Sequence, residues 1–277
     1  MSSLFDNLDT DVASLATFVN AHPRLCVLTG AGISTASGIP DYRDSDGQWK
    51  RSPPVQFRAF MDELATRQRY WARSLIGWRS FGRAQPTVAH RVLARLQAAG
   101  RIHRLITQNV DGLHTAAGSR EVIDLHGRLD RVRCMSCGDI SARAELQQEL
   151  EARNPAWAAL DASVAPDGDV DLVVDDFSSF VVPDCARCGG ILKPDVVFFG
   201  ETVPRDRVDA AMASAREADA MLVVGTSLMV YSGYRFAEAA AAAGRPIAAV
   251  NLGRTRADHL LALKIARPCD EVFAELA

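Results

Sequence analysis

Short apolar segments that alternate with helical patterns constrain the fold of this chain more than any other feature. Continuous apolar runs predict strands that are buried on both faces, at residues 24–29, 102–106, 220–224 and 247–250. Apolar residues at helical spacing predict helices between them, at residues 8–20, 87–100, 205–217 and 232–243. Strands that alternate with helices form a parallel sheet covered on both faces. The predicted fold is therefore an α/β, Rossmann-like domain.

Residues 131–191 interrupt this alternation. They contain two Cys-x-x-Cys pairs and an acidic segment at residues 166–171. The α/β pattern resumes with an apolar run at residues 195–200. We therefore predict a main domain formed by residues 1–130 and 192–277, with residues 131–191 as an inserted module.

The two cysteine pairs predict a metal site. They are Cys134 with Cys137 and Cys185 with Cys188. The N-terminus lacks a basic start and an apolar signal core, so a secretory signal is not expected and metal is favoured over disulfides. Four thiolates form a closed tetrahedral zinc site, which is structural because it has no open coordination position. One structural Zn²⁺ is therefore expected.

A cluster of polar side chains follows the strand predicted at residues 102–106. Gln108, Asn109 and Asp111 stand where this strand gives way to a loop, and His126 follows the next short run. In open α/β sheets this edge binds ligands. An imidazole is well matched to general-base chemistry at neutral pH, so His126 is the candidate base. Asp111 fits two roles equally, as a cap of a short helix or as a ligand-binding residue.

Three loops at strand ends fit a nucleotide site. Gly30 and Gly32 provide half of a dinucleotide fingerprint, but Thr35 stands at the third glycine position. Taken alone, this pattern favours a tight glycine turn. Two further strand ends carry small and amide residues, Gly225-Thr226-Ser227 and Asn251-Leu252-Gly253. Their convergence on one sheet edge favours nucleotide binding.

The net charge and the lengths of the apolar runs disfavour some classes of binding partner. The formal net charge of −3 does not favour nucleic acid or an anionic membrane. No apolar run is long enough to span a bilayer, and no targeting signal is evident. We therefore expect a cytoplasmic protein, monomeric, with no nucleic-acid or membrane partner.

Taken together, the motifs resemble those of the sirtuins. They are Gly-Ala-Gly-Ile-Ser, Gly-Ile-Pro-Asp-Tyr-Arg, Thr-Gln-Asn-Val-Asp-Gly-Leu-His, Leu-His-Gly, the two cysteine pairs, Val-Val-Phe-Phe-Gly-Glu and Gly-Thr-Ser-Leu. They occur in the order of that family over residues 8–275. The segments at 69–73, 165–170 and 230–236 resemble the class II branch, which includes mitochondrial sirtuin 4.

This resemblance implies an NAD-dependent protein-lysine deacylase that transfers the acyl group to ADP-ribose and releases nicotinamide. Its catalytic residues would be His126, as general base, and Asn109. Its substrates would be acylated-lysine proteins. The implied NAD contacts are Gly30, Ala31, Gly32, Ser34, Asp41, Arg43, Gln108, Asn109, Asp111, Gly225, Thr226, Ser227, Asn251, Gly253 and Cys269.

The resemblance also implies how the acyl-lysine segment binds. Val197, Phe198 and Gly200 would offer a strand edge to the substrate backbone. Tyr70 and Arg73 match the spacing of a pair that binds acyl carboxylates in one branch of the family. A solvated helix charge is the simpler interpretation of Arg73. We expect the pocket to accept larger or carboxylated acyl groups better than acetyl.

Three other functions fit parts of the pattern. A protein mono-ADP-ribosyltransferase would use the same site with a different acceptor. A nicotinamide-dependent dehydrogenase is disfavoured by the incomplete glycine fingerprint and by the missing ribose-binding acid. A zinc-ribbon binding module would leave the polar cluster at residues 107–127 without a role.

Overall fold

The structure is a computed structural model that describes residues 2–41, 55–160, 170, 172, 174 and 176–276. Arg43 and most of the acidic segment at residues 166–171 lie outside the described residues. None of the described helices combines the length and the apolar character that crossing a membrane requires.

A six-stranded parallel sheet forms the centre of the molecule, in the order β3-β2-β1-β7-β8-β9. Its strands are β1 (Leu25–Thr29), β2 (Ile102–Thr107), β3 (Ile123–Asp124), β7 (Ala220–Val224), β8 (Ile247–Val250) and β9 (Leu263–Ile265). The predicted strands are confirmed, and β9 is an addition that the sequence did not predict. Thr29 at the end of β1 lies opposite Thr107 of β2 and Val224 of β7, so three strand ends are level. The strand order reverses at β1, and such a point leaves a crevice for ligands.

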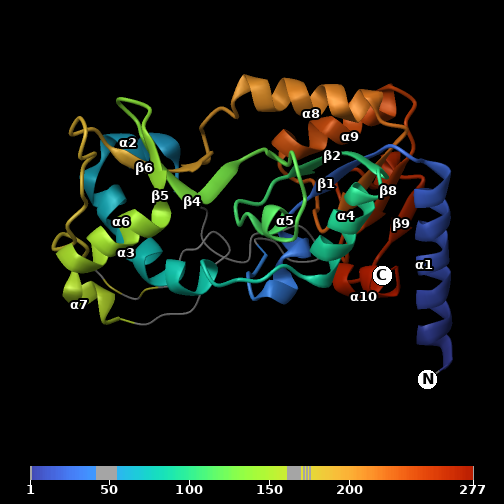
Figure 1. Cartoon of the computed structure of the whole chain (residues 1–277), viewed down its shortest axis with the longest axis horizontal. Helices are drawn as coiled ribbons and strands as arrows, with labels where there is room; N and C mark the ends of the chain where they lie inside the picture. The colour runs from blue at the N-terminus through green and yellow to red at the C-terminus, as the bar shows by residue number, and fades with distance from the viewer. Residues whose placement is uncertain are drawn as a thin grey trace.

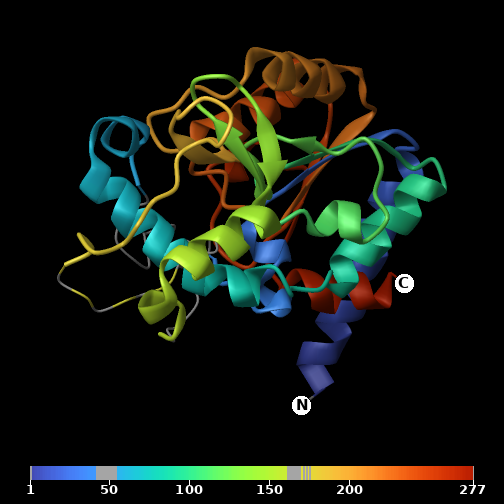
Figure 2. The same cartoon turned by 60° about the vertical axis from the view of Figure 1, so that its left-hand side comes forward.

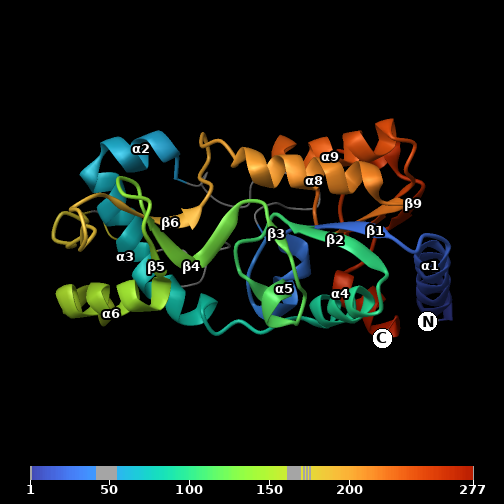
Figure 3. The same ribbon diagram turned by 45° about the horizontal axis from the view of Figure 1, so that its top comes forward.

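Helices cover both faces of this sheet (Figure 3). One face carries α1 (Ser2–Ala21), α4 (Val88–Ala98) and α10 (Cys269–Glu275), and the other carries α8 (Arg205–Glu217) and α9 (Tyr231–Ala242). Side chains of β1 alternate between the two cores: Leu25 and Val27 pack on the first, Cys26 and Leu28 on the second. This double burial explains why the strands are continuous apolar runs.

Shorter elements connect these layers. They are α5 (Leu113–Ala116) and the 3₁₀ turns η1 (Ala31–Ile33), η2 (Thr35–Ser37) and η3 (Asp258–Leu260). Thr87 caps the start of α4, because its hydroxyl accepts from the backbone N–H of His90. Gly100 follows the helix at φ +74°, a conformation that favours glycine.

A second, smaller lobe lies beside the parallel sheet (Figures 1 and 2). It contains an antiparallel sheet, β5-β4-β6, formed by β4 (Gly127–Cys134), β5 (Ile140–Ala142) and β6 (Leu192–Val196). Among the described residues, four helices complete it: α2 (Phe57–Asp62), α3 (Leu64–Phe81), α6 (Arg143–Arg153) and α7 (Pro155–Ala158). Its core includes Phe60, Trp71, Leu150, Phe180 and Phe198.

The small lobe differs from the prediction in two ways, in the pairing of β6 and in the helices that it contains. The apolar run that begins at Asp195 does not resume the parallel sheet, because β6 pairs antiparallel with β4. The helices α2 and α3, which we placed in the main domain, also pack in the core of the small lobe. An apolar run does not identify its partner strand, and this sheet draws on segments that are distant in sequence.

Candidate active site

A cavity of about 600 Å³ opens where the strand ends of the parallel sheet face the small lobe. All but two of the predicted cofactor, catalytic and substrate residues line it: Gly30, Ala31, Gly32, Ser34, Asp41, Tyr70, Gln108, Asn109, Asp111, His126, Val197, Phe198, Gly200, Gly225, Thr226, Ser227, Asn251, Gly253 and Cys269. The exceptions are Arg43, outside the described residues, and Arg73, which is not among the described lining residues. Instead, the Arg73 Nε donates to the Val170 carbonyl at 2.7 Å.

The glycines at the ends of β1 and β7 hold two loops in direct contact. The Gly32 N–H donates to the Gly225 carbonyl at 2.8 Å, and a Cβ on Gly32 would stand 2.9 Å from that oxygen. Gly225 has φ +63°, and a Cβ there would stand 2.4 Å from the Ile33 nitrogen. The two loops can form one wall of the cavity only because both positions lack a side chain.

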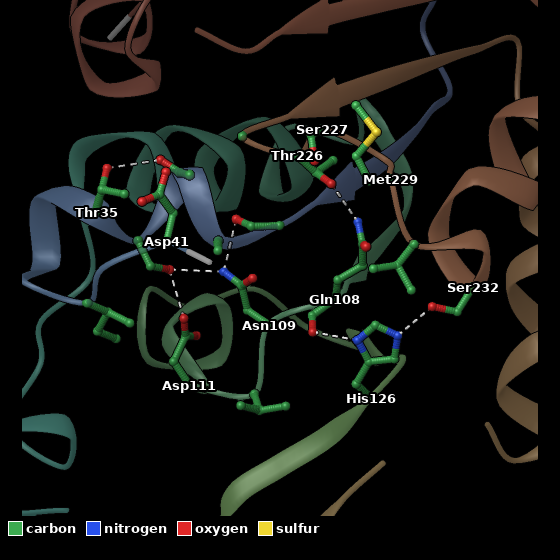
Figure 4. A pocket seen from close by; sticks show the side chains of 18 of the residues that line it. Thr35, Asp41, Gln108, Asn109, Asp111, His126, Thr226, Ser227, Met229 and Ser232 are labelled. Atoms are coloured by element: carbon green, nitrogen blue, oxygen red, sulfur yellow. Dashed lines mark hydrogen bonds between the residues drawn. The ribbon is translucent and has the colours of Figure 1, made fainter. Parts of the chain in front are cut away.

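Asn109, Ser34 and Asp111 form one hydrogen-bonded group in the cavity (Figure 4). The Asn109 amide donates to the Ser34 hydroxyl at 3.0 Å and to the Gly30 carbonyl at 3.1 Å. The Ser34 hydroxyl donates to Asp111 Oδ2 at 2.7 Å, while Asp111 Oδ1 accepts from the Leu113 N–H at 2.9 Å. Asp111 therefore bonds the first N–H of α5, just before the N-cap residue Gly112, and also lines the cavity. Its role in ligand binding stays a prediction.

Gln108 links the end of β2 to two other elements. Its side-chain amide donates to the Thr226 hydroxyl at 2.9 Å. On another side, Gly233 of α9 packs so closely that a Cβ would stand 2.7 Å from the Gln108 side-chain amide carbon. Gln108 thus contacts both the loop after β7, at Thr226, and the start of α9, at Gly233.

Hydrogen bonds set the protonation pattern of His126. Its Nδ1 lies 2.9 Å from the Gln108 carbonyl, which can only accept, so Nδ1 carries the proton. In the neutral ring, Nε2 is then an acceptor, and it lies 2.9 Å from the Ser232 hydroxyl. Burial lowers the pKa of His126 from 6.5 to about 4, against the opposing effect of the Gln108 bond, and Arg235 and Arg207 lower it further. The ring is therefore neutral near pH 7, as a base must be.

The acidic limb of kcat/KM is expected at about pH 4, not near 6.5, because the base form of His126 persists down to its lowered pKa. The measurement is a pH profile of the deacylase activity that the sequence resemblance implies, taken only where circular dichroism shows folded protein. This control matters because unfolded histidines take up protons that the buried rings resist, so stability falls as the pH drops from 6.5 towards 4. A limb between pH 6 and 7 would contradict the assignment of the base.

Two other histidines near this edge are structural. His90 contacts the Thr87 hydroxyl at the start of α4, and His114 Nε2 bonds the Thr29 hydroxyl at 2.8 Å. Their rings stand 4.5 Å apart, and burial lowers the pKa of both. Neither is among the described residues that line the cavity. Both therefore stabilise the elements around the cavity and do not face it.

The segment at residues 197–200 forms the wall of the cavity on the side of the small lobe. The Val197 N–H donates to the His126 carbonyl at 2.8 Å, and the Phe198 N–H donates to Glu201 Oε2 at 2.9 Å. The Phe199 carbonyl accepts from the Phe57 N–H at 2.8 Å. The Phe198 carbonyl also accepts from the Glu201 N–H at 3.0 Å, so four backbone groups of this segment are bonded and pairing with a substrate backbone stays a prediction.

The four paired cysteines come together in the small lobe. Their sulfur atoms all lie within 4.8 Å of one another, with Cys134 and Cys188 at 3.5 Å and Cys137 and Cys185 at 3.9 Å. Zn–S bonds of about 2.3 Å in a tetrahedron require S···S separations of roughly 3.8 Å. The cluster therefore fits one zinc ion. The cysteines are not among the described cavity residues, which agrees with a structural role.

Sequence reasoning missed Ser232, although it bonds the predicted base. The two residues are 106 positions apart, and a serine near a predicted helix start is more simply interpreted as a cap. Apolar lining residues were missed as well, among them Ile39, Phe81, Val110 and Leu129. Their apolar character is equally typical of an ordinary core.

The chain is similar to known proteins in both sequence and structure. A family model described as the Sir2 family matches residues 30–232. The chain is 64% identical over 271 residues to the NAD-dependent protein deacetylase of Bordetella bronchiseptica, covering 98% of this chain and 99% of that one. It is 48% identical over 265 residues to the mitochondrial NAD-dependent protein lipoamidase sirtuin-4 of Bos taurus, covering 95% and 84%. A solved structure of Sir2 with a p53 peptide and NAD⁺ superposes with a TM-score of 0.74, at 29% identity and 95% coverage of each chain.

Proposed function

We infer that this chain, which belongs to the Sir2 family, is an NAD-dependent protein-lysine deacylase. The observation that carries this conclusion is the cavity at the strand ends. There, a neutral imidazole with a fixed tautomer stands beside the hydrogen-bonded group of Ser34, Asn109 and Asp111. The similarity to sirtuin-4 supports a place in the class II branch.

The cavity fits NAD. It is about 600 Å³ in volume, and two glycine-bearing loops and the cation of Arg254 line the part formed by the parallel sheet. We propose that Gly30 to Ser34 and Gly225 to Ser227 hold the dinucleotide, with Asn251 and Gly253 beside them. Bound NAD supplies the ADP-ribose that accepts the acyl group and the nicotinamide that leaves.

The chain's own groups then have distinct roles. Asn109 and Asp111 present an amide and a carboxylate to the nicotinamide side. His126 receives a proton at Nε2, and the Gln108 carbonyl stabilises the resulting cation through Nδ1. Holding both substrates in one cavity contributes much of the acceleration, because an amide oxygen is a weak nucleophile.

Mass spectrometry of the products tests this function directly. Incubation with NAD and a mixed acyl-lysine peptide library is expected to yield deacylated peptide, acyl-ADP-ribose and nicotinamide in equal amounts. A protein carrying ADP-ribose without deacylated peptide would instead indicate the mono-ADP-ribosyltransferase. Reduced cofactor absorbance would indicate a dehydrogenase.

For the acyl group, we propose a larger, neutral chain, which narrows the expectation of larger or carboxylated groups. Tyr70 is buried in the cavity wall, with its ring 5.3 Å from Phe198, while the Arg73 guanidinium donates to a backbone carbonyl. Among the described lining residues the only cations are Arg254 and Arg267, which follow β8 and β9 at the nucleotide side. The name of the bovine relative, a lipoamidase, supports the same choice.

Octanoyl- and lipoyl-lysine peptides are therefore expected to exceed acetyl-lysine by about tenfold or more in kcat/KM, since each buried methylene contributes ~0.8 kcal/mol. Succinyl-lysine is expected to be poor. As a control, Arg73→Gln should leave the succinyl-to-acetyl ratio unchanged. A wild-type preference for succinyl that this variant removes would restore the carboxylate-binding role of Arg73.

Two further properties rest on the sequence alone. We propose that the protein is cytoplasmic and monomeric. Cell fractionation and light scattering of the purified protein test these two points.

A further inference from the structure

Both ring nitrogens of His126 are engaged. Nδ1 bonds the Gln108 carbonyl at 2.9 Å and Nε2 bonds the Ser232 hydroxyl at 2.9 Å. Figure 4 shows the Ser232 hydroxyl pointing at the His126 ring from the start of α9. A base with no open nitrogen can act only if one partner leaves or if one partner passes the proton on.

The position of Ser232 is well fixed. It lies in the first turn of α9, where the helix has no side-chain cap, so its hydroxyl serves His126 and not its own helix. The next residue, Gly233, packs against Gln108, and the Ser232 carbonyl accepts from the Arg235 guanidinium at 3.1 Å. Ser232 itself lines the cavity, so its oxygen also faces the space where substrates bind.

We propose that Ser232 relays the proton between the acceptor hydroxyl of the substrate and His126. This inference rests on the deacylase function. The acceptor O–H bond breaks and its proton passes to Ser232 Oγ, while the serine's own proton passes to Nε2. The acceptor oxygen bonds the acyl carbon as the imidazolium forms. The proton then returns through the same hydroxyl to the lysine nitrogen as the bond between that nitrogen and the acyl carbon breaks. A water molecule then adds to the same carbon and releases the acyl ester, so that protein atoms and charge are restored.

A purely structural role for Ser232 leads to different results. If the hydroxyl only orients the ring or steps aside for the substrate, its removal leaves Nε2 open to direct contact. Deacylation would then persist or improve. If the hydroxyl relays the proton, its removal leaves the base without a path to the acceptor.

The first test uses Ser232→Ala, Ser232→Thr, which keeps a hydroxyl, and Tyr231→Phe as a control at the neighbouring position of α9. Proton transfer by a positioned group contributes about 10²–10⁴-fold. We expect Ser232→Ala to lose about 10²-fold in kcat with KM values for NAD and peptide within about twofold of wild type. Exchange of labelled nicotinamide should continue, because it precedes the proton transfer. Ser232→Thr should recover most of kcat, and Tyr231→Phe should match wild type.

The second test needs no NAD. Diethyl pyrocarbonate modifies an open imidazole nitrogen, and peptide mapping reports its rate at His126. We expect slow modification in wild type and Ser232→Thr, and several-fold faster modification in Ser232→Ala. Equal rates would show that the hydroxyl does not hold Nε2 and would overturn the proposal.

Three other outcomes also decide the matter. Full deacylation by Ser232→Ala overturns the relay. So does loss of nicotinamide exchange together with deacylation in a variant that folds normally, because binding would then be at fault. A wild-type protein that neither exchanges nicotinamide nor deacylates refutes the deacylase function, and the relay with it, whatever the modification rates are.

Discussion

Replacing His126 by alanine is expected to lower kcat for deacylation by about 10²–10⁴-fold, the range that a positioned general base contributes. The ring occupies the cavity with Nε2 as the acceptor, and it is neutral at physiological pH because burial lowers its pKa to about 4. Within the part of the chain that the structure describes, no carboxylate bonds the ring, and the Gln108 carbonyl orients Nδ1. The measurement is steady-state deacylation of the best acyl-lysine peptide, followed by mass spectrometry.

The release of nicotinamide, which precedes the proton transfer, should continue in His126→Ala. Asn109, Ser34 and Asp111 bond one another and not His126, so the nicotinamide side of the cavity keeps its geometry. Exchange of labelled nicotinamide into NAD should therefore stay within about tenfold of wild type, in line with the size of a single lost contact. The matched control is His259→Ala, which removes an exposed imidazole in η3. Deacylation above a tenth of the wild-type rate in His126→Ala would show that another group is the base.

Much of the parallel sheet could be predicted because its strands are buried on both faces. The predicted runs at 220–224 and 247–250 coincide with β7 and β8, and the helix predicted at 205–217 coincides with α8. The small lobe could not be assembled in this way. Its sheet joins β4 to β6 across some 60 residues, and its core takes α2 and α3 from before β2. The local hydrophobic pattern predicts that a segment is buried. It does not predict which distant segment packs against it.

The residues of the candidate site also fall into those that the sequence could predict and those that it could not. Residues of the strand-end loops were predictable because parallel strands bring their ends together, as Thr29, Thr107 and Val224 show. Ser232 was not predictable, because a hydroxyl at a helix start is most often a cap. Arg73 shows what spacing alone leaves open. Its spacing from Tyr70 suggested a carboxylate site, and in the folded helix its Nε donates to the Val170 carbonyl, so the comparison of succinyl- and acetyl-lysine peptides decides its role.

Removing one cysteine ligand is expected to destabilise the whole small lobe. In Cys134→Ser, zinc content should fall well below one per chain, and the melting temperature should fall by about 10 °C or more. Structural zinc contributes about 10–16 kcal/mol in small zinc domains, and in a protein of this size 1 kcal/mol shifts the melting temperature by roughly 2–4 °C. Cys134 ends β4, whose neighbour β6 leads directly into the cavity wall at Val197 and Phe198. Deacylation should therefore be lost although no cysteine of the cluster lines the described cavity.

Arg187→Ala is the matched control, because Arg187 lies between Cys185 and Cys188 and is largely exposed. Its ion pair with Asp139, at 3.4 Å, is a surface pair that contributes about 0–1 kcal/mol, so zinc content and melting temperature should stay near wild type. Metal analysis by mass spectrometry and calorimetry report the two quantities. If Cys134→Ser kept one zinc per chain and full deacylation, the cluster would not be a four-thiolate site. A loss of zinc with an intact melting temperature would mean that packing around Trp71 and Leu150 holds the lobe together without the metal.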